Sequence, residues 1–240
     1  MKSKNKGFSL VELSIVIVVM GLLAALSVAG KELIRLAKVK SIISEVEAYK
    51  IASDNFKSQY NYLPGDLSNA TSFWASTTNG DGNGAIGVTA SNTGTEVFDA
   101  WQQLGLAKLI PASTLTGTGT VAVIGTNVPA SQNIDAGGYS FTYKAPGGWL
   151  DQLSRSVTSN NLVLGSYNAS YDWLWNPALD PEMAYMIDSK VDDGKPNFGK
   201  VMSDGSSTAC TTVASGVYNA SVSYSLSNQN KTCWMFFNLE

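Results

Sequence analysis

Few side chains in this sequence have a type and spacing that could support chemistry. The chain contains no histidine, so it lacks the commonest general base and the commonest transition-metal ligand of proteins. It contains two cysteines, and if they form a disulfide, no thiol is left to act as a nucleophile. We therefore do not expect an enzyme, and the side chains that need an explanation are carboxylates.

One group of oxygen-bearing side chains is typical of the first half of a calcium-binding loop. Asn79, Asp81 and Asn83 alternate with glycines, as at the start of an EF-hand loop. The second half is missing, because Ala90 stands where the bidentate glutamate belongs. A calcium site would need carboxylates from elsewhere, and the acidic candidates are Asp188, Asp192 and Asp193. A plain Asn/Gly turn with positive φ angles explains the same loop without any ion.

A long apolar stretch lies near the start of the chain. Between Phe8 and Gly30 the only ionisable side chain is Glu12, and a helix of this length, rising about 1.5 Å per residue, can cross the roughly 30 Å hydrocarbon core of a membrane. Three lysines within the first six residues predict a cytoplasmic N-terminus and an external C-terminal part. A secretory signal peptide is the alternative. The run is longer than the usual apolar region of about 7–15 residues, and no small-x-small cleavage site closes it.

The two cysteines, Cys210 and Cys233, both lie near the C-terminus, in the part that we expect outside the membrane. An oxidising compartment favours a disulfide between them. Two free buried thiols are the alternative.

Glu12 lies within the apolar run, where a carboxylate costs roughly 2.5–3.5 kcal/mol on insertion scales and needs a partner. It could sit near the interface, protonated or turned toward water. Its neighbours suggest a specific role. Gly7 followed by Phe8-Ser-Leu-Val-Glu12 closely resembles the processing motif of type IV prepilins and type II secretion pseudopilins.

The resemblance implies a leader peptide of residues 1–7. A membrane peptidase would cut between Gly7 and Phe8 and methylate the new amine of Phe8. The amine of a neighbouring subunit would neutralise Glu12 during assembly. Pseudopilin-like heads also commonly hold a calcium ion in a loop, and the stretch from Asp188 to Pro196 is similar to one found in such heads.

The resemblance also implies partners and a location. The partners would be the prepilin peptidase, an inner-membrane assembly platform, membrane lipid, and other pilin subunits in a helical filament of a pilus or pseudopilus. The protein would first cross the bacterial inner membrane once, with its head in the periplasm. A nucleic-acid partner is not expected, since the net charge is −3 and no cluster of basic residues follows residue 60.

The fold class that we predict is α+β, with a pilin-like helix packed on an antiparallel sheet. The helix would have a membrane or filament-core half at residues 8–30 and an amphipathic half at 31–62, because apolar residues then recur mostly every three or four positions. The motif Leu63-Pro64-Gly65-Asp66 stops it. Residues 63–240 would form the head.

Several elements of the head follow from local patterns. Apolar residues at helical spacing predict a helix over Glu96–Ile110, and Asp180 before Pro181 predicts a helix of one or two turns. Alternation predicts strands around Val121–Ile124, Tyr139–Tyr143 and Asn161–Leu164, with a final strand from Trp234.

The aromatic stretch Tyr171-Asp172-Trp173-Leu174-Trp175 has two interpretations. Aromatic faces stack on sugars, so the alternative function is a minor tip pilin whose head binds a ligand. The simpler interpretation is that these rings supply core and interface area.

Overall fold

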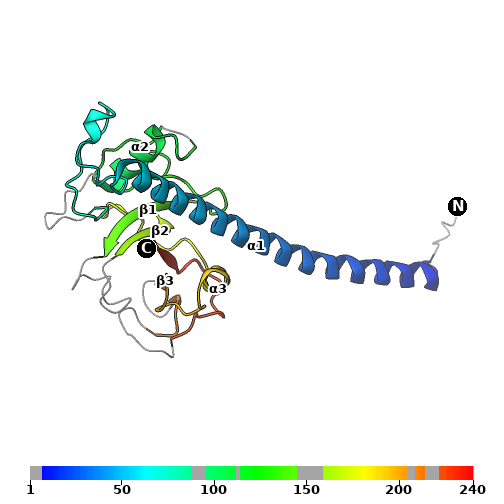
Figure 1. Ribbon diagram of the computed structural model, residues 1–240. Helices are drawn as coiled ribbons and strands as arrows, with labels where there is room; N and C mark the ends of the chain where they lie inside the picture. The colour runs from blue at the N-terminus through cyan, green and yellow to red at the C-terminus, as the bar shows by residue number, and fades with distance from the viewer. Residues whose placement is uncertain are drawn as a thin grey trace. The chain divides into compact units, whose positions relative to one another are not determined.

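The computed structural model describes residues 7–87, 96–111, 114–144, 159–204, 209–213 and 222–239. The chain divides into two compact units, residues 1–40 and residues 41–240; we call the second the head. The elements labelled in Figure 1 are α1 (Leu10–Tyr60), the short 3-10 turn η1 (Ala70–Ser72), α2 (Glu96–Leu106), β1 (Gly137–Lys144), β2 (Ser159–Ser166), α3 (Pro181–Val191), β3 (Val201–Asp204) and β4 (Trp234–Asn238).

The first helix, α1, is continuous from Leu10 to Tyr60, as the sequence predicts, and contributes to both units. Its sequence contains no proline, so nothing removes a backbone donor along its length. Within the head, Ile42, Val46 and Phe56 are buried at helical spacings, which is the predicted apolar stripe.

The predicted turn after α1 contains a glycine, Gly65, that the packing requires. Gly65 has a φ of 85°, and a Cβ there would lie 2.3 Å from the carbonyl oxygen of Glu96. Its N–H donates to the side chain of Gln103 at 2.8 Å. The turn therefore lies directly against α2, closer than any residue with a side chain could come.

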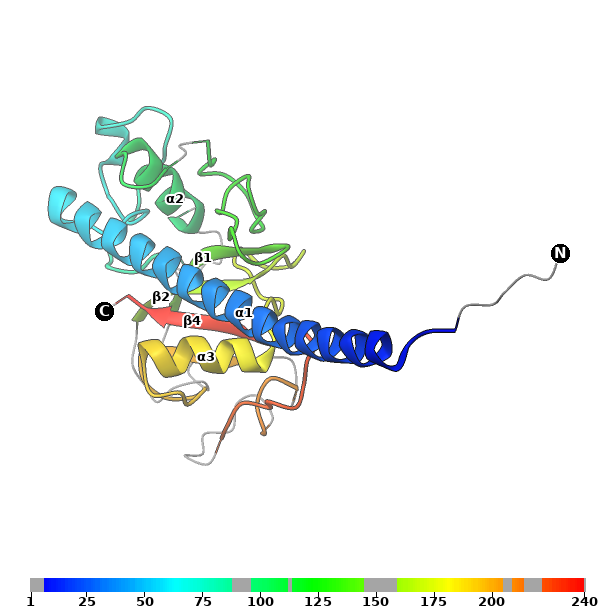
Figure 2. The same ribbon diagram turned by 90° about the vertical axis from the view of Figure 1, so that its right-hand side faces the viewer.

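Four strands form one antiparallel sheet in the order β1-β2-β4-β3. The C-terminal strand β4 thus lies between β2 and β3, and Figure 2 shows β4 next to β2. Its register aligns Phe236 with Val163 and Phe237 with Leu162. The predicted antiparallel sheet and the predicted final strand are confirmed.

One face of the sheet packs on helices. The ring of Tyr139, on β1, lies 5.1 Å from that of Tyr49 on α1. Phe141, two residues further along the same strand, stacks on Trp101 of α2 at 4.3 Å. Residues two apart on a strand share a face, so this is the face that the head's part of α1 covers. The predicted packing of helix on sheet is confirmed.

The opposite face is covered by the aromatic stretch at residues 171–175. Trp173 belongs to a buried cluster with residues of three strands, Val163, Met202, Trp234 and Phe236. The backbone N–H of Leu174 donates to Ser140 Oγ at 3.0 Å, and Ser140 points away from the helices because its neighbours on β1 point toward them. Trp173 supplies core and the partly buried Trp175 packs against it, whereas Tyr171 is exposed.

Three local predictions need correction. Val121–Ile124 is not a strand and contributes only an isolated bridge between Ile124 and Val128, because the chain turns back on itself there, with Asn127 N and Val128 N both donating to the Val123 carbonyl. The second helix ends at Leu106 rather than at Ile110, since Lys108 adopts a left-handed φ of 59°.

The third correction concerns the length of α3 and the strand that follows it, β3. The helix α3 runs from Pro181 to Val191, longer than the predicted one or two turns, and Asp180 caps it by accepting a hydrogen bond from Met183 N at 2.8 Å. The strand β3 was not predicted, because its four residues are too few to show alternation and only pairing with β4 defines them.

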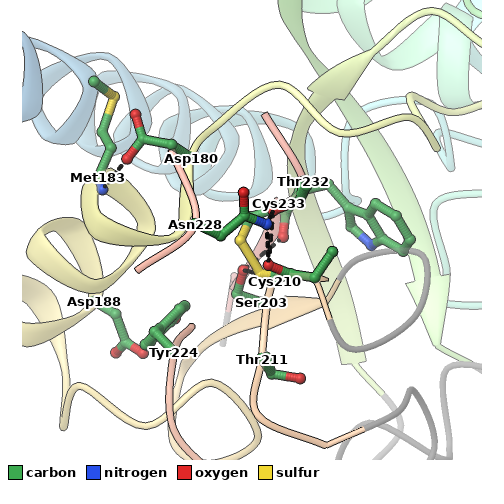
Figure 3. Close-up of a disulfide and its surroundings, with 12 residues drawn as sticks. Asp180, Met183, Asp188, Ser203, Cys210, Thr211, Tyr224, Asn228, Thr232 and Cys233 are labelled. Atoms are coloured by element: carbon green, nitrogen blue, oxygen red, sulfur yellow. Dashed lines mark hydrogen bonds between the residues drawn. A yellow bond between two sulfur atoms is a disulfide. The ribbon is translucent and has the colours of Figure 1, made fainter. Parts of the chain in front are cut away.

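The predicted disulfide between Cys210 and Cys233 is confirmed. Figure 3 shows it with its surroundings, and both cysteines are fully buried. Cys233 directly precedes β4, so the bond ties the segment around Cys210 to the sheet. Asn228 Nδ2 and Thr232 Oγ1 both donate to the carbonyl of Ala209, at 2.7 and 3.0 Å, so hydrogen bonds hold the same segment.

A single carboxylate on α1 anchors the chain that enters β1. Glu45 accepts hydrogen bonds from Tyr139 Oη at 2.7 Å, Asn133 Nδ2 at 2.7 Å, Ser131 Oγ at 3.0 Å and Gln132 N at 3.3 Å. Hydrogen bonds to an ionised acceptor are roughly twice as strong as neutral ones. Glu45 therefore joins α1 to the loop before β1 as well as to the strand itself.

We predict that Glu45→Ala lowers the free energy of unfolding of the head by about 2–4 kcal/mol, because it leaves several donors without their acceptor. The head contains all six tryptophans, so their fluorescence during urea unfolding of the full chain in detergent reports on it. The matched control is Glu47→Ala, at an exposed position of the same helix, where a change within about 0.5 kcal/mol is expected. Equal effects of the two substitutions would contradict the anchoring role.

Candidate functional site

The apolar half of α1 presents its side chains to the surroundings. α1 is long and apolar enough to cross a membrane, and none of its most apolar window is buried. Within residues 1–40, the large apolar side chains from Leu10 to Leu26 are all exposed, for example Leu10 by 87% and Leu22 by 61%. So much contiguous apolar surface is not stable in water and needs lipid or other protein to cover it.

Glu12 lies in the first turn of this helix. Gly7, Phe8 and Ser9 precede the helix and are not helical. Glu12 Oε2 accepts a hydrogen bond from Ser9 N at 2.8 Å, and Ser9 Oγ accepts one from Val11 N at 3.2 Å. The carboxylate is thus held at the helix start, where the N-terminal end of the helix dipole favours a negative charge.

Gly7 is not required by the packing of this chain. A Cβ at this position would have no heavy atom of the described residues within 4 Å, and Gly7 is not among the residues with positive φ. A need for glycine here would therefore come from a partner that binds this segment. The rest of the predicted leader, residues 1–6, lies outside the described residues.

Residues 2–28 match the family described as the prokaryotic N-terminal methylation motif. This chain therefore carries that motif at its N-terminus. A curated relative of the pilin-like chain is Fimbrial protein EcpC of Eikenella corrodens, which is 29% identical over 137 residues, covering 57% of this chain and 88% of the relative. No solved structure matches the chain.

The motif, the relative and the fold agree. The long apolar helix and the antiparallel four-stranded sheet form a pilin-like α+β architecture, and a pilin-type structural subunit is the function that they support. The disulfide and the candidate membrane helix fit the same description.

Among the residues that the structure describes, the head contains two carboxylate clusters that could hold a metal ion. In the first, Asp66, Asp81 and Glu96 each offer an oxygen within 4.8 Å of the others. Burial is the largest cause that raises the pKa of Asp66 and of Glu96, and the nearby Asp81 raises both further. Asp66 accepts hydrogen bonds from the backbone of Asn83 and Gly84, so the glycine-rich loop wraps around the carboxylate.

Glu96 holds the same loop from the other side. Its two oxygens accept hydrogen bonds from Asp81 N at 3.0 Å and Gly87 N at 3.1 Å. Gly82, Gly84 and Gly87 all have positive φ, as the turn interpretation of the sequence expects. These contacts explain the Asn/Gly loop by its own carboxylate partners. Asn79 accepts hydrogen bonds from Thr71 instead.

The second cluster joins Asp188, Asp192 and Asp193 at the end of α3. Asp188 is fully buried and accepts hydrogen bonds from Tyr224 Oη at 2.8 Å and from Gly194 N at 3.1 Å; Figure 3 shows the side chains of Asp188 and Tyr224 pointing toward each other. Burial is the main cause that raises the pKa of Asp188 to about 7.

The possible calcium site predicted from the sequence combined Asp81 with the three C-terminal aspartates, but the structure divides these residues between two clusters. The partners of Asp81 are Asp66 and Glu96, which the loop pattern did not indicate because they lie outside it. Both clusters have the carboxylate chemistry that calcium prefers.

We predict that the head becomes less stable as the pH rises through about 7, because of Asp188. A folded-state pKa above the ordinary value of 3.8 means that the contribution is complete below about pH 4 and is lost as the pH rises through the folded pKa. The free energy of unfolding of the unchanged chain, relative to Asp188→Asn, should therefore fall between about pH 4 and pH 7.

Urea unfolding in the presence of a chelator measures this difference without interference from cations. The matched control is Asp135→Asn, at an exposed position. A difference between the unchanged chain and Asp188→Asn that stays constant over this pH range would contradict the prediction.

Calcium binding stays a prediction, which thermal melts of the full chain test. Millimolar calcium should raise the melting temperature of the head relative to chelator, since a ligand that binds only the folded state stabilises it. Asp81→Asn removes the gain if the first cluster binds, and Asp192→Asn removes it if the second does. Identical melts in calcium and in chelator would leave the loop as a turn that its own carboxylates organise.

Proposed function

We propose that this chain is the precursor of a pilus subunit that is cut between Gly7 and Phe8 and assembles through α1. The observation that carries the proposal is the exposed apolar surface from Leu10 to Leu26, which lies within the methylation motif matched at residues 2–28. In the membrane, lipid would cover this surface. In a filament, the same surfaces of neighbouring subunits would cover one another.

The processing step is a hydrolysis followed by a methyl transfer. Water breaks the peptide bond, leaving a carboxylate on Gly7 and an amine on Phe8, and a methyl donor then replaces one proton of that amine. The prepilin peptidase would act at the cytoplasmic face of the inner membrane, and an inner-membrane assembly platform would move the subunit into the filament. The fimbrial relative favours a pilus over a pseudopilus.

The Glu12 carboxylate would then form an ion pair with the N-terminal amine of a neighbouring subunit. The carboxylate lies four residues after the new N-terminus, in the first turn of α1. Within an apolar filament core a charged amine and a carboxylate attract strongly, and either one buried alone is costly. The pair would therefore fix the axial position of one subunit against its neighbour.

We predict that filaments sheared from the cell surface yield a mature chain beginning at methylated Phe8, as measured by N-terminal mass analysis. Glu12→Ala should leave the subunit folded in the membrane and strongly reduce the amount of filament, because the core then contains an unpaired amine. Glu47→Ala, at an exposed position in the head, is the control.

An intact Met1 in mature filaments, or a cut far inside the apolar run, would overturn the proposal. Normal filament assembly by Glu12→Ala would overturn the role of Glu12. Mature protein found only in the periplasm, with none in surface fibres, would indicate a pseudopilin instead.

A further inference from the structure

The side chains of Ser9 and Glu12 each accept a hydrogen bond from the backbone at the start of α1. Ser9 Oγ accepts a hydrogen bond from Val11 N at 3.2 Å, and the carboxylate of Glu12 accepts one from Ser9 N at 2.8 Å. The spacing Ser-x-x-Glu, with the glutamate reaching back to Ser9 N, is that of a capping box, and the Ser9 hydroxyl caps the second helical residue, Val11. We call this pair the capping box, because both side chains satisfy backbone donors that the helix itself cannot. Ser9 is therefore the N-cap of α1.

The capping box decides where the helix begins. Helical structure starts at Leu10, and Gly7 and Phe8 stay outside it. A peptide bond inside a helix is enclosed by its backbone hydrogen bonds, whereas one in a non-helical exposed segment is open to a protease. The bond between Gly7 and Phe8 lies just outside the cap, and the space around Gly7 is open.

We propose that Ser9 is a positioning residue for precursor processing. Together with Glu12 it stops the helix short of the Gly7–Phe8 bond and so keeps this bond accessible to the peptidase. This inference rests on the proposed function. It gives Glu12 a role in the precursor, before the amine that it would pair with in a filament exists.

The two roles of Glu12 are compatible. The capping bond uses Oε2, and a carboxylate has a second oxygen that can accept a bond from a neighbouring amine. The cut also leaves the N–H of Ser9 in place, because the broken bond lies one residue earlier. The capping box would thus hold the carboxylate near the new N-terminus before and after processing.

The roles can be separated because glutamine also completes a capping box. Glu12→Gln keeps an oxygen acceptor for Ser9 N but removes the charge that pairs with an amine. Ser9→Thr keeps a hydroxyl cap. Ser9→Ala removes the cap and introduces the strongest helix former, so the helix can extend toward Phe8 and Gly7.

The test is the rate at which purified prepilin peptidase cuts the full-length chain in detergent, followed by mass spectrometry. Loss of the cap should lower kcat/KM about fivefold in Ser9→Ala and Glu12→Ala, a factor that corresponds to the roughly 1 kcal/mol typical of an N-cap. The rescuing variants Ser9→Thr and Glu12→Gln should be cut at nearly the rate of the unchanged chain.

Two further measurements exclude a general effect on the helix. Ser14→Ala removes another serine hydroxyl of α1, which donates to the Val11 carbonyl at 2.9 Å and takes no part in the cap, and its cleavage rate should not change. Ser9→Ala combined with Glu12→Ala should slow cleavage no more than either alone, because both substitutions break the same unit.

Cleavage of Ser9→Ala at the rate of the unchanged chain would overturn the inference. So would equal losses in Ser9→Thr and Ser9→Ala, since the peptidase would then be contacting the side chain rather than responding to the cap. If the unchanged chain is not cut between Gly7 and Phe8, the proposed function itself fails. Filament assembly that fails in Glu12→Gln despite normal cleavage would support both roles of Glu12.

Discussion

The structure depends first on apolar surface that cannot remain in water. From Leu10 to Leu26, α1 exposes large apolar side chains on all sides, and a helix that is apolar all round belongs in lipid or among other helices. The distinctive residues of the N-terminus all lie next to this apolar surface. The one carboxylate, the cap and the motif glycine all lie at its very beginning, where the chain would enter the membrane.

The head uses the other end of the same helix in a different way. From residue 41 on, one stripe of α1 is buried, and its tyrosine and glutamate side chains contact the first strand and the loop before it. The sheet is covered on its other face by aromatic rings, so the strands are buried on both sides. A sheet enclosed in this way needs few strands to form a stable core.

Carboxylates organise the loops of this protein in a consistent manner. Glu12, Glu45, Asp66, Glu96 and Asp188 each accept hydrogen bonds from the backbone N–H groups or side chains of a neighbouring segment. A buried or half-buried carboxylate can satisfy several donors at once, which suits glycine-rich loops that have few side chains of their own. Where burial outweighs these hydrogen bonds, it raises the pKa of the carboxylate, as at Asp188.

The sequence by itself determined what depends on neighbours along the chain. The continuous helix to Tyr60 and the capped start of α3 at Asp180 follow from local spacing, because helices and caps are defined within a few residues. Pairing across the sheet is not local. Only the tertiary structure defined β3, removed the predicted strand at Val121–Ile124, and brought Asp66 and Glu96 to Asp81, because these contacts join segments whose proximity no local pattern encodes.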